Sequence, residues 1–103
     1  MRKLRVDRNQ SEIVELLRQL GVSVFDTHTV GRGFPDAVLG FRGATYLAEI
    51  KDGKRLGWKL TPAQIKFIVR WNGSAIVIFT CTDDVLTWVE SKKHERYRSS
   101  IRA

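Results

Sequence analysis

The chain has 103 residues, a formal net charge of +7 and an isoelectric point of about 10.1. This length corresponds to one domain, residues 1–103, and an apolar content of 43% is enough for a hydrophobic core. The single cysteine, Cys81, excludes an internal disulfide and a cysteine-rich metal site. A domain this basic is expected to bind a polyanion, with nucleic acid as the first candidate, although an ordinary soluble protein can also carry a basic surface.

The N-terminal segment is basic, but it is not followed by an apolar stretch of the kind found in signal peptides. The longest apolar run, residues 75–79, is too short to span a bilayer. The sequence therefore predicts a cytoplasmic protein with no membrane association. The basic tail, about residues 92–103, is expected either to extend the last helix or to be loose.

In chain order, apolar residues at helical spacing predict a first helix over about 9–20, which Gly21 ends. An alternating, β-branched stretch then predicts a strand over 22–30. A loop rich in glycine and proline follows, because these residues favour turns. Two further strands, 36–41 and 44–51, are expected to form a hairpin through a tight turn at 42–43.

Three agreeing signals mark the start of a second helix. Thr61 suits the N-cap, Pro62 suits the first helical position, and Gln64 completes a capping box. This helix is predicted to run to about residue 71, and Trp71 is expected in the core or in a dimer interface.

A fourth, largely apolar strand over 74–80 is expected to be covered on both faces. A last helix, with Asp83 or Asp84 as its cap, is expected to bury three apolar residues, Val85, Trp88 and Val89. The resulting order, αβββαβα, predicts an α/β domain in which a mixed sheet is flanked by helices. The connection from the third strand to the fourth is long enough for a crossover between parallel strands.

Three charged residues on the predicted hairpin are candidates for chemistry: Asp36, Glu49 and Lys51. Glu49 and Lys51 lie two apart near the end of a strand, so their side chains leave the same face. Counting outward from the turn at 42–43 places Asp36 opposite Glu49 on the neighbouring strand. The two carboxylates can therefore meet, unless all three residues are simply polar groups on a solvated face.

Two carboxylates held close together repel each other, and they stay ionised only with a cation between them. Oxygen ligands favour a hard cation, and Mg²⁺ commonly binds one or two carboxylates and keeps several waters. A lysine beside such an ion provides positive charge near a scissile phosphate or helps to deprotonate the attacking water. These groups are the ones that phosphodiester hydrolysis requires.

Three segments together resemble the PD-(D/E)xK nuclease superfamily, namely Gly33-Phe34-Pro35-Asp36, Glu49-Ile50-Lys51 and Leu60-Thr61-Pro62-Ala63-Gln64. The closest resemblance is to the stand-alone VRR-NUC nucleases of phages and bacteria, which are relatives of Holliday-junction resolvases. It covers about residues 8–86 and implies a restriction-endonuclease-like fold. It also implies that Asp36, Glu49 and the backbone carbonyl of Ile50 bind Mg²⁺ or Mn²⁺, that Lys51 is catalytic, and that Gln64 lies beside the site.

One position departs from the family pattern. The family often has a metal-binding glutamate in the first turn of the first helix, and the position that lines up best here is Gln10. An amide binds a cation more weakly than a carboxylate does. Either the site uses fewer carboxylates or Gln10 acts through a metal-bound water, so the number of metal ions stays open.

Other residues are candidates for contact with DNA. Arg32 lies in the glycine-flanked loop before Asp36, where phosphate contact is expected. The loop after Lys51 places basic residues around an aromatic one, which is typical of DNA-contacting loops, although Trp58 could instead pack back on the domain. The basic residues of this loop are Lys54, Arg55 and Lys59. His28, Asp26 and Thr27 are expected to be structural, with His28 satisfied or exposed on a strand.

The sequence therefore predicts a Mg²⁺-dependent DNA endonuclease, and the resemblance to resolvases implies four-way junctions as the substrate. A twofold dimer would match the symmetry of such a junction. Two alternatives stay open: a nuclease that acts on flaps, duplex ends or RNA, and a DNA-binding module without catalytic activity.

Overall fold

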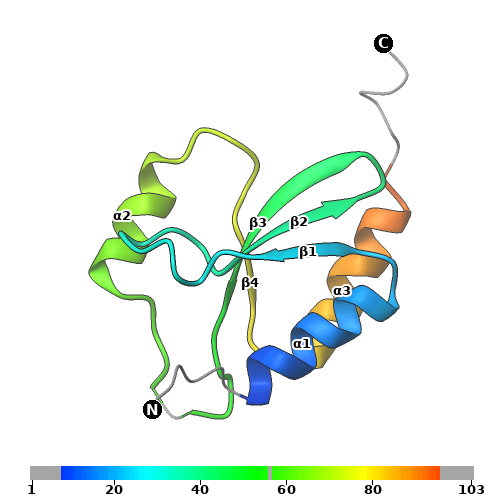
Figure 1. Ribbon diagram of the computed structural model, residues 1–103, viewed down its shortest axis with the longest axis horizontal. Helices are drawn as coiled ribbons and strands as arrows, with labels where there is room; N and C mark the ends of the chain where they lie inside the picture. Colours follow the sequence, from blue (N-terminus) through cyan, green and yellow to red (C-terminus); the bar gives the residue numbers. More distant parts are fainter. Residues whose placement is uncertain (1–7, 56, 96–103) are drawn as a thin grey trace.

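The computed structural model describes residues 8–55 and 57–95, which form three helices and four strands in the predicted order. The elements are α1 (Arg8–Gln19), β1 (Ser23–Asp26), β2 (Ala37–Phe41), β3 (Ala44–Ile50), α2 (Pro62–Arg70), β4 (Val77–Phe79) and α3 (Thr82–Lys93), as labelled in Figure 1. The basic N-terminal residues before Arg8 and most of the basic tail, residues 96–103, lie outside the described part of the chain.

The β2–β3 hairpin has the register that the sequence predicts. Ala37 lies opposite Ala48, and Phe41 lies opposite Ala44. The turn between the strands has two left-handed residues, Arg42 with φ 52° and Gly43 with φ 84°, as a tight type I′ turn requires. One step beyond the paired residues, this register brings residue 36 opposite residue 49.

The sheet is mixed, with strand order β1-β2-β3-β4. The predicted crossover is confirmed, because β3 and β4 run parallel and Ile50 lies opposite Phe79. The fourth strand was expected over 74–80 with both faces covered, and this expectation is wrong. Only Val77–Phe79 pair with β3, because β4 lies at the sheet edge and bonds only the last three residues of that strand. The faces are not fully covered, since Val77 and Ile78 stay half-buried.

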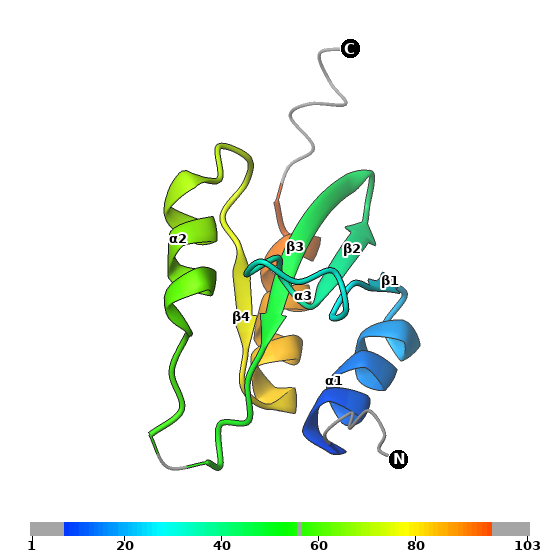
Figure 2. The same cartoon turned by 60° about the vertical axis from the view of Figure 1, so that its left-hand side comes forward.

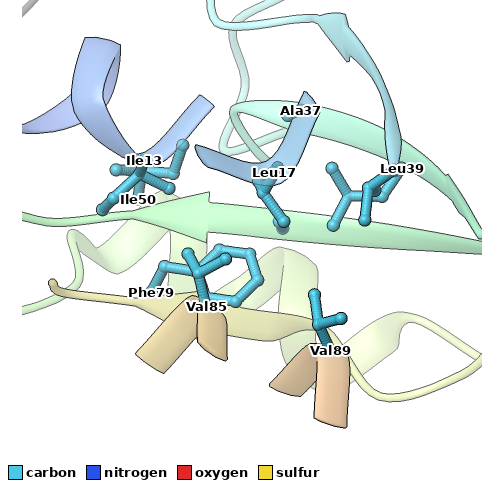
Figure 3. Packing of buried hydrophobic residues seen from close by; sticks show 10 residues of the cluster. Ile13, Leu17, Ala37, Leu39, Ile50, Phe79, Val85 and Val89 are labelled. Carbon is cyan, nitrogen blue, oxygen red and sulfur yellow. The ribbon is translucent and has the colours of Figure 1, made fainter. Parts of the chain in front are cut away.

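Helices α1 and α3 pack on one face of the sheet, whereas α2 lies on the other (Figure 2). Figure 3 shows the core between α1, α3 and the sheet, to which α1 contributes Ile13 and Leu17 and α3 contributes Val85 and Val89. Trp88 is half-buried and packs edge-on against Phe79, with ring centroids 5.8 Å apart. None of the residues of α2 is buried.

The strand predicted over 22–30 is shorter than expected. It ends at Asp26, because the chain turns where the hydroxyl of Thr27 donates to the carbonyl of Pro35 at 2.8 Å and the Val30 amide donates to the Thr27 carbonyl. The turn carries residues 27–36 across the sheet toward α2 (Figures 1 and 2). His28 therefore lies in a turn and not on a strand.

Two further expectations are corrected. The N-cap of α3 is Cys81, whose side chain makes no capping hydrogen bond, whereas Asp84 lies in the first turn. The Asp84 carboxylate accepts from the Thr80 amide at 2.7 Å, and this bond holds the pKa of Asp84 below its usual range. Trp71 is the C-cap of α2 and is 42% exposed, which excludes the core position, while its place in a dimer interface stays a prediction.

Candidate functional site

Asp36 and Glu49 come together where β2 begins and β3 ends. Glu49 is 2% exposed, and Asp36 is half-buried. The carboxylate Oδ2 of Asp36 accepts from the amide of Ile50 at 2.8 Å, so the aspartate bonds to the strand that carries Glu49. Hairpin register thus decides the site, because a slip of one residue would send Glu49 to the opposite face.

The surroundings of the two carboxyl groups disfavour a double negative charge. Burial raises the pKa of Glu49 to about 8, and the negative charge of Asp36 adds to this effect. Burial also raises the pKa of Asp36, against the Ile50 amide and the charge of Lys51, which lower it. Two carboxyl groups in this arrangement are neutralised either by a shared proton or by a cation.

Lys51 lies beside this pair, as its spacing from Glu49 predicts. Its Nζ is 3.9 Å from Oε2 of Glu49, and 18% of its side chain is exposed. The Lys51 amide donates to the Phe79 carbonyl, and the Lys51 carbonyl accepts from the side-chain amide of Asn9 at 2.9 Å. These bonds hold the backbone of Lys51 in place while its ammonium group reaches solvent next to the carboxylates.

Gln64 has both of the roles considered for it. Its Oε1 accepts from the Thr61 amide at 2.8 Å, and the Thr61 hydroxyl accepts from the Gln64 amide, which completes the capping box. Its Nε2 donates to Oε2 of Glu49 at 2.5 Å. The start of α2 is thereby tied to the carboxylate pair, and one oxygen of Glu49 has a fixed orientation.

A pocket of about 590 Å³ runs along α1 and reaches Asp36, and Gln10 lies in its wall. In the described part of the chain, no three acidic, histidine or cysteine side chains are grouped so as to hold a metal ion. The oxygen donors brought together are the two carboxylates; with the carbonyl of Ile50, whose amide bonds Asp36, they would make a set that fits a Mg²⁺ ion that keeps several waters.

His28 approaches the site from the turn after β1. Its Nδ1 lies 2.6 Å from Oδ1 of Asp26, and its Nε2 is buried without a hydrogen-bond partner. The expectation of a satisfied or exposed histidine is therefore wrong. The tertiary fold of the turn after β1 creates this environment, and no local sequence pattern predicted it.

The basic residues predicted to contact DNA are divided between two places. Arg55, Trp58 and Lys59 line a pocket of about 430 Å³ together with Ile50 and Lys51, so this loop shares a pocket with the candidate catalytic lysine. Lys54 is exposed on the same loop, where its amide donates to the carboxylate of Asp52. Arg32 does not join this loop, because the turn after β1 carries it to α2.

Comparison with known proteins identifies no relative. No protein-family model, no curated protein and no solved structure matches the chain. No helix in residues 8–55 and 57–95 is long and apolar enough to cross a membrane. The chain is thus a small α/β domain whose candidate site rests on its own geometry.

Proposed function

We propose that this chain is a metal-dependent nuclease of the PD-(D/E)xK type, with a restriction-endonuclease-like arrangement of its sheet and helices. One observation carries the proposal. Asp36 and Glu49 lie together on neighbouring strands, Glu49 is buried, and Lys51 lies on the face of Glu49. A purely structural role does not account for two carboxyl groups placed where burial raises both pKa values and the charge of Asp36 raises the pKa of Glu49 further.

The residues present fit Mg²⁺ or Mn²⁺. Asp36, Glu49 and the Ile50 carbonyl would hold the ion, and Gln10, which lines the same pocket as Asp36, would act through a water molecule. When bound, the ion would lower the pKa of the attacking water and stabilise the charge that develops on the scissile phosphate. It would also relieve the repulsion between the two carboxylates, which the fold keeps together without it.

The chain's own groups have separate roles in this proposal. Gln64 holds one oxygen of Glu49 so that the carboxylate keeps its orientation. Lys51 provides a positive charge beside the phosphate and strengthens its interaction as negative charge develops in the transition state. The basic loop that contains Arg55 and Lys59 would bind the DNA backbone next to the cleaved bond.

The proposed substrate is branched DNA, with a four-way junction first. A domain of 103 residues offers little surface to hold such a junction, which favours a twofold dimer with two sites. Flaps, duplex ends and RNA are the alternative substrates for the same chemistry. A DNA-binding module without catalysis is the alternative function.

Cleavage of labelled four-way junction, flap, duplex, single strand and RNA, with Mg²⁺ or Mn²⁺, tests the proposal. We expect Asp36→Asn and Glu49→Gln each to abolish cleavage, because each removes an anionic ligand. Asp83→Asn is the matched control, since Asp83 is exposed on α3 and is not part of the carboxylate pair. Cleavage by either site variant at the wild-type rate would refute the assignment, and binding without any metal-dependent cleavage would support the non-catalytic alternative.

A further inference from the structure

A second cluster of basic residues lies on α2, outside the carboxylate site. A shallow pocket of about 240 Å³ is formed between α2 and the loop that precedes Asp36. We call it the basic pocket, and its lining residues are Arg32, Ala63, Lys66, Phe67, Arg70 and Trp71. Half of these side chains are cationic and two are aromatic.

The positive charges of the basic pocket have no counter-charge within residues 8–55 and 57–95. Among the described residues, neither Arg32 nor Lys66 nor Arg70 makes a salt bridge or a side-chain hydrogen bond. By contrast, Lys51 and Lys92 each lie within 4 Å of a carboxylate oxygen. Three like charges around one hollow repel one another, and an anion in the hollow would relieve that repulsion.

The backbone at Arg32 is unusual. Arg32 has φ 58° and lies between Gly31 with φ 85° and Gly33 with φ 80°, so three consecutive residues are left-handed. Such a conformation suits glycine but is disfavoured for a residue with a Cβ atom. A glycine at position 32 would adopt this backbone conformation with less strain than arginine does. The presence of arginine there points to a function of its side chain.

Close packing fixes this loop against α2. A Cβ atom on Gly33 would lie 2.2 Å from the backbone oxygen of Ala63, so no other residue allows the loop to approach the helix this closely. Ala63 lines the basic pocket and directly precedes Gln64, which bonds Glu49. The position of Arg32 is therefore coupled through one turn of α2 to the carboxylate site.

Aromatic rings form the opposite wall. Phe67 stacks on Trp71 with ring centroids 5.4 Å apart, and Phe34 packs edge-on against Phe67 at 5.3 Å. A Cβ atom on Gly73 would lie 2.6 Å from the indole nitrogen of Trp71, so the ring is held between Phe67 and the chain after the helix. A rigid, partly exposed tryptophan beside unpaired cations is typical of surfaces that bind single-stranded nucleic acid.

We propose that the basic pocket binds the phosphodiester backbone of an unpaired DNA strand next to the nuclease site. The inference rests on the proposed function and narrows its substrate to DNA that has a single-stranded segment close to the cleaved bond. Arg32, Lys66 and Arg70 contact the phosphates of that strand. Because α2 bonds Glu49 through Gln64 and lines the basic pocket through Lys66 and Arg70, it links strand binding to the site.

Binding of a labelled oligo(dT) single strand, measured in EDTA at several salt concentrations, tests the proposal without any cleavage. We expect Lys66→Ala and Arg70→Ala each to weaken binding several-fold and to reduce the slope of log affinity against log salt by about 0.7, as expected for one lost contact to a single strand. Lys93→Ala is the control of equal charge, because Lys93 is exposed on α3, across the sheet. Its salt slope should equal that of the wild type.

Arg32→Gly separates binding from folding. It removes the charge and suits the left-handed backbone, so the melting temperature should stay the same or rise while affinity for the strand falls several-fold. Unchanged affinity in all three pocket variants, or losses no larger than in Lys93→Ala, would overturn the proposal. Equal affinity for dTTP and for the oligonucleotide would also overturn it, because the pocket would then bind a nucleotide and not a strand.

The same variants distinguish the two proposals. Pocket-dependent strand binding in EDTA supports the basic pocket even if metal-dependent cleavage is never observed, in which case only the nuclease assignment fails. Normal cleavage combined with unaltered strand binding in all three variants overturns the basic pocket and leaves the nuclease assignment standing.

Discussion

The substitution Glu49→Gln should increase the stability of the metal-free protein, and the increase should grow with pH. In the fold, burial and the charge of Asp36 raise the pKa of Glu49 from 4.5 to about 8. The folded state therefore holds a proton that the unfolded chain releases. The contribution of Glu49 to the free energy of unfolding is fully present below about pH 4.5, and it is lost as the pH rises toward about 8.

The structure sets the size of this effect. One pKa unit corresponds to about 1.4 kcal/mol, so the shift of Glu49 corresponds to at most about 5 kcal/mol. Entry of water around the deprotonated pair reduces this value, and we expect a loss of roughly 2–5 kcal/mol for wild type between pH 5 and pH 9. Glutamine has the shape of a protonated glutamate and can still accept from Gln64, so the variant should escape the loss.

The assay is urea unfolding of both proteins in EDTA between pH 5 and pH 9. The measurement compares the two free energies of unfolding, because titrating groups that do not interact with Glu49 contribute equally to both proteins. Addition of Mg²⁺ at pH 8 should then stabilise the wild type and not the variant, since binding to the folded state alone shifts unfolding by mass action. A difference in stability that stays constant from pH 5 to pH 9 would refute the reasoning.

Three further predictions concern the site and its supports. Lys51→Ala should bind a four-way junction within about tenfold of wild type but cleave it at least ~100-fold more slowly, and equal losses in binding and cleavage would make Lys51 a phosphate anchor instead. Gln64→Ala should lower both the free energy of unfolding and the cleavage rate. Thr61→Ala should cost about 1 kcal/mol of stability through the lost cap and leave cleavage intact. Equal cleavage by the two variants would argue against the bond between Gln64 and Glu49. Gly33→Ala should lower the free energy of unfolding by about 2–4 kcal/mol, measured by urea unfolding. The control Gly31→Ala should lower it by about 1 kcal/mol, because the added Cβ atom would meet open space. Similar losses in the two variants would contradict the close packing of Gly33.

Local physics made much of the fold predictable. The order of helices and strands follows from hydrophobic periodicity, and the start of α2 follows from the Thr61, Pro62 and Gln64 signals, which the structure confirms. The hairpin is also a local structure. Once its turn lies at residues 42 and 43, pairing places Asp36 opposite Glu49 without reference to the rest of the chain.

Elements that depend on distant partners were predicted less well. The end of β1 is decided by the bond between Thr27 and the Pro35 carbonyl, and the length of β4 by how much of β3 lies beside it. Residue propensities carry no information about such contacts, which explains why both strands were expected to be longer. The cap of α3 was placed wrongly because Asp84 bonds back to Thr80 from inside the helix.

The sequence by itself determined which residues form the carboxylate pair and the neighbouring lysine, because hairpin register and strand alternation are local rules. Only the tertiary structure decided that Gln64, which caps a helix as the sequence predicts, also holds Glu49, since that bond needs α2 to return to the face of β3 that carries the site. Tertiary structure likewise separated Arg32 from the basic loop after Lys51 and joined it to Lys66 and Arg70. These residues are distant in sequence, and the turn after β1, packed through Gly33 against Ala63, is what brings them together.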